Sequence, residues 1–385
     1  MKRYLCMVLC MALVLTGMPE VSAEGLGLSA KSAVVMDAMT GRVIYEKNAH
    51  AVLPMASTTK IMTALCAIEQ GNPDDMVKVH PSAVGVEGSS MYLGHGETLT
   101  LRDLLYGLML ASGNDAAVAI AMHISGGILE FADLMNRTAQ KIGATQTSFR
   151  NPNGLDAEGH HTTAYDLARI TRYAMKYELF RTIVSSRTAK MPWAGHDYPR
   201  VLNNHNKLLK MYDGADGVKT GYTKKDGRCL VSSATRNGFQ VIAVTLNAPN
   251  DWDDHAKMLD FAFDQYTAKP LVKAGDYLRT VMVKRGMGSS VQVHAGGDLT
   301  IPVPKGEAPD VQVLYHIPDV VDAPVGFEAV LGRVEAVYDN EVIASVDAVA
   351  AGAVAEREIP RLWMSLRMIL RDWLTMYANQ GRIFK

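Results

Sequence analysis

The sequence has little cysteine, almost no net charge and no long apolar run. It contains four cysteines in 385 residues and has a formal net charge of -1. This charge gives no general reason to expect nucleic acid as a partner, so any charge-driven binding must be local. The N-terminal apolar run Tyr4–Leu15 is shorter than the roughly 20 residues that cross a bilayer comfortably. The zinc-protease motif H-E-x-x-H is absent.

The N-terminus has the features of a secretory signal peptide. Lys2 and Arg3 precede the apolar run, and Val21–Ala23 supplies small residues for cleavage. We expect residues 1–23 to be removed, so that the mature chain begins at Glu24 outside the cytoplasm. The alternative is an uncleaved N-terminal anchor.

The cysteines give no sign of catalysis. Cys6 and Cys10 leave with the signal peptide, and Cys66 and Cys229 remain within apolar runs. A single disulfide and two buried thiols are both consistent with export, because cysteine also packs as a small hydrophobe. No histidine stands beside either residue in a recognisable nucleophile motif.

The order of elements predicts an α+β fold for residues 24–266. A β-hairpin is expected within Ala33–Tyr45, and helical spacing begins after Pro54, which places Ser57 near a helix N-terminus. An antiparallel sheet covered by helices fits a terminal hairpin, a helical block and late strands. Further helices are expected at 101–110, 114–124, 128–142, 163–177 and 251–266, and strands at 230–233 and 241–246.

Two further segments follow this domain. Alternating apolar residues with Gly and Pro punctuation predict a small all-β domain over 267–353. Residues 354–385 predict an amphipathic helix with its apolar face formed by Leu362, Leu366, Ile369, Leu370, Trp373 and Tyr377. Its basic excess and two tryptophans favour a helix lying in a membrane interface. The alternative is a helix docked on its own protein.

Ser57-Thr58-Thr59-Lys60 is a candidate nucleophile motif. Lys60 projects from the same helical face as Ser57, so its amine can reach the serine hydroxyl. A serine attacks only when a base takes its proton, and lysine can be that base when burial or a like charge lowers its pKa. Lys219 is a candidate for that like charge. The competing interpretation is a capped helix with an exposed lysine.

Two later motifs complete a candidate site. In Ser112-Gly113-Asn114, Gly113 allows a turn between two helices, so that the Ser112 hydroxyl can relay a proton and the Asn114 amide can hold a carbonyl. The alternative is an ordinary helix N-cap. Lys219-Thr220-Gly221 on a strand edge suits a peptide carboxylate and backbone pairing. Its alternative is a surface turn.

These motifs, with their flanks, closely resemble the low-molecular-mass penicillin-binding proteins that act as serine D-Ala-D-Ala carboxypeptidases. The resemblance runs from about Ser29 to the C-terminus and is strongest in the first domain. It implies a penicillin-binding/β-lactamase-like transpeptidase domain. The stretches that carry it include Ser29–Ala33, Asp37–Gly41, Met55–Ala64, Ser112–Ala116, Gly154–Asp156, Thr163–Ala168 and Asp216–Gly221.

The resemblance implies roles for individual residues. Ser57 would attack the penultimate D-Ala carbonyl of a peptidoglycan stem peptide with Lys60 as base, while Ser112 and Asn114 handle the leaving amine and orient the substrate. The substrate-binding strand would be Lys219, Thr220, Gly221 and Tyr222. The oxyanion would lie against the N–H groups of Ser57 and Tyr222, and β-lactam antibiotics would acylate the same serine. Tyr222 stands where some relatives carry histidine.

Three rival functions remain at this point. A class A β-lactamase would need a glutamate-activated water, and no equivalent is evident between the second and third motifs. For a non-catalytic wall-binding protein, the substitution Ser57→Ala would change nothing measurable. Metal chemistry would need ligands from His160, His161, Asp251, Asp253, Asp254 and His255. The acidic residues among these are better explained as first-turn helix charge, so no metal or other cofactor is expected.

Overall fold

The computed structural model describes residues 25–306, 311–357 and 361–380. The expected signal peptide, with its cleavage site after Ala23, lies outside the described residues. Contacts divide the chain into two units: the first ends at Asp264, and the second begins at Gln265 and includes Asn237–Phe239. Each unit is described by itself below.

The first unit contains a five-stranded sheet with the order β2-β1-β9-β8-β7. β1 pairs antiparallel with both β2 and β9, and β7 pairs antiparallel with β8. The expected hairpin and late strands are therefore present in one sheet. The strands of this sheet are β1 (Ser32–Asp37), β2 (Val43–Lys47), β7 (Ala215–Thr223), β8 (Gly227–Arg236) and β9 (Phe239–Leu246).

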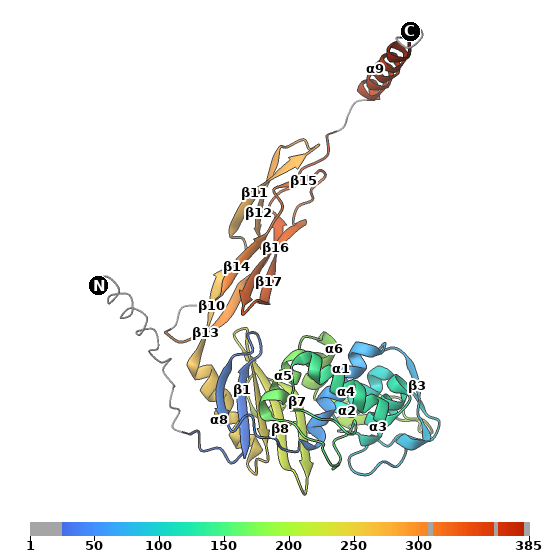
Figure 1. The fold of residues 1–385 in the computed structure, drawn as a ribbon, viewed down its shortest axis with the longest axis vertical. Coiled ribbons are helices and arrows are strands. Elements are labelled where there is room, and N and C mark those ends of the chain that lie inside the picture. Colours follow the sequence, from blue (N-terminus) through green and yellow to red (C-terminus); the bar gives the residue numbers. More distant parts are fainter. Residues whose placement is uncertain (1–24, 307–310, 358–360, 381–385) are drawn as a thin grey trace, which may run out of the picture. The chain divides into compact units, whose positions relative to one another are not determined.

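Helices lie on both faces of this sheet (Figure 1), which confirms the α+β prediction. The helices of the first unit are η1 (Ala56–Thr59), α1 (Lys60–Gln70), η2 (Pro81–Ala83), α2 (Leu101–Met109), α3 (Asn114–Ser125), α4 (Ile128–Ile142), α5 (Ala164–Ala174), α6 (Glu178–Ser185), α7 (Leu208–Met211) and α8 (Asp251–Gln265). Two small ribbons are formed by β3 (Met76–Lys78) with β4 (Thr98–Thr100), and by β5 (Thr188–Met191) with β6 (Arg200–Asn203).

Alternation along the strands explains how both faces are covered. On β9, Ile242 and Val244 pack into the large core shared with α1–α6, whereas Thr245 hydrogen-bonds His255 of α8. Because side chains alternate across a strand, one face meets the helical block and the other meets α8. Cys66 and Cys229 lie buried as free thiols in this core, and burial raises the pKa of each to about 12.

The second unit is β-rich, as the sequence predicts. A six-stranded sheet has the order β14-β16-β17-β12-β11-β15, and β10 pairs with β13. A separate apolar core includes Val281, Val293 and Val325. The strands are β10 (Tyr266–Val272), β11 (Tyr277–Lys284), β12 (Ser290–Ala295), β13 (Leu299–Pro304), β14 (Gln312–His316), β15 (Val320–Asp322), β16 (Val330–Tyr338) and β17 (Glu341–Ala350).

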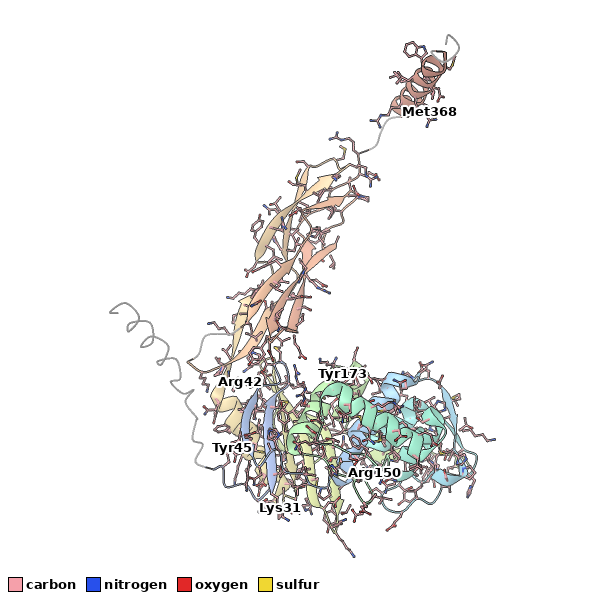
Figure 2. All side chains as sticks on the ribbon, in the orientation of Figure 1. Lys31, Arg42, Tyr45, Arg150, Tyr173 and Met368 are labelled. Carbon is pink, nitrogen blue, oxygen red and sulfur yellow. The ribbon has the colours of Figure 1, made fainter. Side chains whose placement is uncertain are left out.

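The last described element is α9 (Arg361–Gln380), which lies within the segment 354–385 where the sequence predicts an amphipathic helix. The predicted start is too early, because Val354 and Glu356 form β-bridges with Val325 and Gly286. Met368, labelled in Figure 2, and Ile369 and Leu370 are exposed large apolar side chains on it. Among the residues with a described placement, no single helix is both long enough and apolar enough to cross a membrane.

Candidate active site

The structure brings the three sequence motifs together around Ser57. Ser57 is the second residue of η1, and Lys60 is the first residue of α1. Ser112 and Asn114 lie where α2 gives way to α3, and Lys219 lies within β7. The expected helix start at Ser57 is confirmed.

The amine of Lys60 sits among three oxygen atoms. Its Nζ atom lies 3.0 Å from Ser57 Oγ, 2.7 Å from Asn114 Oδ1 and 2.6 Å from the carbonyl oxygen of Asn153. A charged amine donates to all three. A neutral amine donates to the two carbonyl oxygens and turns its lone pair to the serine hydroxyl, which is the arrangement a general base needs.

Electrostatics favour the neutral form of this amine. The Lys60 side chain is fully buried, and burial followed by the positive charge of Lys219 holds its pKa well below the ordinary value, while Asp115 acts in the opposite direction. Burial disfavours an ammonium, and a like charge disfavours it further. Both effects expected from the sequence are therefore present, and the exposed-lysine alternative is wrong.

Asn114 is the residue that orients Lys60. Its Oδ1 accepts from the amine, and its Nδ2 donates to the carbonyl oxygen of Glu87 at 2.5 Å. The backbone N–H of Asn114 donates to the carbonyl oxygen of Ser89 at 2.7 Å. These contacts fix the amide, so Asn114 holds the Lys60 amine in place, in addition to the substrate-orienting role that the resemblance implies. The sequence did not predict this second role.

The turn before Asn114 differs from the prediction in its backbone. The left-handed residue is Ser112, with a φ of 58°, whereas Gly113 has a φ of −58°. Conformational freedom at Gly113 is therefore not what makes the turn. A Cβ at Gly113 would lie 2.7 Å from Asp115 Oδ1, so close packing explains this glycine. Gly113 is also the N-cap of α3, with no side-chain capping hydrogen bond, so the N-cap interpretation of Ser112 and Asn114 is wrong.

Lys219 is a second buried lysine. Its side chain is almost fully buried, its Nζ atom donates to the carbonyl oxygen of Thr220 at 2.7 Å, and burial lowers its pKa to about 7. A carboxylate brought beside it would find an otherwise poorly solvated positive charge. Placement of this motif within a strand rules out the surface-turn alternative.

β7 approaches Ser57 at Gly221. A Cβ on this residue would lie 3.1 Å from the backbone nitrogens of Ser57 and Thr58, so the absence of a side chain permits the approach. β7 ends the sheet order, and Tyr222 next to Gly221 is exposed. An edge strand beside a nucleophile can pair with an extended peptide.

His205 and Asn153 are residues that sequence reasoning missed. The backbone N–H of His205 donates to the carbonyl oxygen of Leu110 at 3.3 Å, and burial and then the charge of Lys219 lower the pKa of its ring. Asn153 contributes its backbone carbonyl oxygen, which accepts from the Lys60 amine. A backbone contact such as that of Asn153 cannot be predicted from a pattern of side chains. The segment around His205 matches none of the motifs considered.

Three of the residues considered as metal ligands have other partners. His160 hydrogen-bonds Thr59, Asp254 accepts from Ser29 and Ala30, and His255 hydrogen-bonds Ser232. Within the described part of the chain, no three His, Cys, Asp or Glu residues are grouped as a metal site would require. As expected, Asp251, Asp253 and Asp254 lie in the first turn of α8.

Comparisons with known proteins identify relatives of the chain. A family model described as D-alanyl-D-alanine carboxypeptidase matches residues 19–250, and one described as the C-terminal domain of penicillin-binding protein 5 matches residues 266–356. D-alanyl-D-alanine carboxypeptidase DacF of Bacillus subtilis is 37% identical over 367 residues, which cover 89% of this chain and 92% of that protein. DacD of Escherichia coli is 31% identical over 333 residues, covering 82% and 84% respectively.

Solved structures give the same result. Penicillin-binding protein 5 from Haemophilus influenzae superposes with a TM-score of 0.60 at 30% identity, covering 86% of this chain and 98% of that one. DacD from Francisella tularensis has a TM-score of 0.60 at 29% identity, covering 86% and 94%. The class defined by the fold and site is that of low-molecular-mass penicillin-binding proteins. The chain belongs to the D-alanyl-D-alanine carboxypeptidase family.

Proposed function

We propose that the chain removes the terminal D-Ala from peptidoglycan stem pentapeptides through an acyl-enzyme on Ser57. The observation that carries this proposal is the buried amine of Lys60, 3.0 Å from the Ser57 hydroxyl oxygen and held by Asn114. It supplies a nucleophile with its base in place. Family membership supplies the substrate class.

The acylation step uses this pair directly. Neutral Lys60 takes the proton of Ser57 as Oγ bonds to the penultimate D-Ala carbonyl carbon. The negative charge on the carbonyl oxygen is stabilised by the backbone N–H groups of Ser57 and Tyr222. The C–N bond then breaks, and the leaving amine receives its proton by way of the Ser112 hydroxyl. D-Ala departs, and water hydrolyses the ester to regenerate Ser57.

Substrate recognition rests on β7. The ammonium of Lys219 and the hydroxyl of Thr220 hold the terminal carboxylate, and Gly221 lets the peptide lie close to Ser57. A β-lactam carries a carboxylate and a reactive carbonyl in a similar relation. It acylates the same serine and is released slowly.

We propose that the enzyme works outside the cytoplasm, on the outer face of the bacterial cytoplasmic membrane. The sequence features of residues 1–23 support export. The exposed apolar side chains of α9 and its arginines support attachment to the membrane surface.

Two substrates test this function in one preparation. We expect a fluorescent penicillin to label the wild-type chain covalently and a D-Ala-D-Ala peptide to yield free D-Ala, with both signals lost in Ser57→Ala. No label on Ser57 and no released D-Ala would overturn the proposal. Rapid hydrolysis of penicillin without a stable adduct would favour a β-lactamase instead.

A further inference from the structure

The residue before the nucleophile, Ala56, is held in an unfavourable conformation. Its φ is 48°, in the left-handed region that residues with a side chain rarely adopt. Such a conformation persists only when its surroundings hold it. Ala56 is fully buried, and its backbone N–H and C=O groups each have a side-chain partner.

On one side the partner is Asp226, from the turn between β7 and β8. Its Oδ2 accepts from the Ala56 N–H at 3.0 Å, across 170 positions of sequence. The Asp226 carboxylate is buried, and its own backbone N–H donates to Thr223 Oγ1 at 3.0 Å. This carboxylate ties the residue before the nucleophile to the turn that follows Tyr222.

On the other side the partners are Thr59 and His160. The Thr59 hydroxyl donates to the Ala56 carbonyl oxygen at 2.8 Å, and its Oγ1 lies 2.8 Å from His160 Nε2. The opposite ring nitrogen, Nδ1, accepts from the backbone N–H of Arg150 at 3.0 Å. The ring proton is therefore on Nε2, and donation runs from His160 through Thr59 to Ala56.

The Ala56 carbonyl and the Ser57 N–H belong to one planar peptide unit and point in opposite directions. Fixing the carbonyl therefore fixes the N–H. Gly154 packs so closely that a Cβ on it would lie 2.0 Å from the Ala56 carbonyl oxygen, which leaves this peptide little room to turn.

We infer that Asp226 and His160 are positioning residues that hold Ala56 so that the Ser57 N–H points at the developing oxyanion. This inference rests on the proposed function, because that N–H is one of the two proposed oxyanion donors. Neither side chain is assigned a contact with the substrate. Both act through the backbone of Ala56, His160 by way of the Thr59 hydroxyl.

Substitutions that keep or remove one hydrogen bond test this role. Thr59→Val and Asp226→Ala each remove one of the hydrogen bonds that hold Ala56. We expect each variant to lower the acylation rate constant, measured at saturating fluorescent penicillin, by about 10- to 100-fold. Misplacing an oxyanion donor has effects of this size. His160→Gln can still donate to Thr59, whereas His160→Asn is too short to reach it. We expect His160→Gln to acylate within about threefold of the wild-type rate, and His160→Asn to be slower. Asp226→Asn should also acylate within about threefold of the wild-type rate, because the asparagine side chain keeps an acceptor for the Ala56 N–H.

Two buried residues of α8, which covers the face of the sheet opposite the helical block, serve as controls. Asp254→Ala removes a carboxylate that accepts backbone N–H groups, and His255→Asn shortens a hydrogen-bonded buried histidine. Both should lower the melting temperature without slowing acylation. Wild-type acylation rates in Thr59→Val and Asp226→Ala, or equal rates in the two His160 variants, would overturn the positioning role. An unlabelled wild-type chain would instead count against the proposed function itself.

Discussion

The Nζ atom of Lys60 lies 3.0 Å from the Oγ atom of Ser57, and the two residues are three positions apart where η1 passes into α1. This spacing makes the contact possible, and the surroundings make it useful. A lysine in water is charged at neutral pH and cannot accept a proton. Burial and the neighbouring Lys219 lower the pKa of the Lys60 amine and so favour the neutral form that can accept one.

Replacing the proposed base should slow acylation strongly while leaving the fold intact. Lys60→Met keeps the apolar stem in its buried position but has no atom that accepts a proton. We expect labelling by fluorescent penicillin to slow by about 10²- to 10⁴-fold, the usual contribution of a general base. Lys141→Met is the matched control, because the Lys141 amine is exposed and pairs with Glu69 at 3.3 Å. A Lys60→Met protein labelled at the wild-type rate would show that another group is the base.

The buried charge of Lys219 should make stability rise with pH above neutrality. Burial lowers its folded-state pKa to about 7, whereas its unfolded value is ordinary at 10.5. Below pH 7 both states are protonated and the full penalty of the buried ammonium applies. Between the two values the unfolded chain binds more protons, so the free energy of unfolding increases with pH.

The measurement is the melting temperature from pH 6 to 9.5 for the wild-type chain and Lys219→Met. Groups that titrate alike in both proteins cancel in the difference. We expect the wild-type chain to gain stability relative to the variant as pH rises. A difference that is constant with pH would contradict the lowered pKa.

Much of this site was predictable because its side chains lie in short motifs. The register of a helix start places Ser57 and Lys60 on one face, and the strand character of Lys219 follows from its neighbours. The contacts that complete the site were not predictable in this way. Asn153 acts through its backbone, and Asp226 reaches Ala56 across 170 positions, so no local pattern reports either.

Backbone conformation was also beyond the sequence. Glycine at position 113 suggested the left-handed residue of the turn, yet Ser112 adopts that conformation and Gly113 is needed for close packing. A glycine can meet either need, and only the neighbouring atoms decide which applies. The element types of the first unit, by contrast, follow from apolar periodicity, which depends on burial of whole faces.

Gly154 should be intolerant of a methyl group for reasons of space as well as conformation. It has a φ of +85°, and a Cβ would lie 2.0 Å from the Ala56 carbonyl oxygen. Gly126 has a similar φ of +73° with nothing within 4 Å, so Gly126→Ala carries the conformational cost alone. That cost is roughly 1–2 kcal/mol.

We therefore expect Gly126→Ala to lower the free energy of unfolding by about that amount and to acylate normally. Gly154→Ala should lower both stability and acylation rate further, because the Ala56–Ser57 peptide has to move. Denaturant titration and penicillin labelling measure the two effects. Equal behaviour of the two variants would mean that the contact between Gly154 and Ala56 is not tight.

The C-terminal helix should determine where the enzyme is found in the cell. A chain ending at Val354 lacks α9, and we expect it in the soluble fraction after cell lysis, whereas the full chain sediments with membranes. Leu370 is 57% exposed on the apolar face, so Leu370→Asp should weaken attachment by placing a charge at the lipid boundary. Thr375→Asp adds the same charge to the polar face and should leave attachment unchanged. Labelling with fluorescent penicillin follows the enzyme in each fraction, and a truncated chain that still sediments would show that α9 is not the attachment.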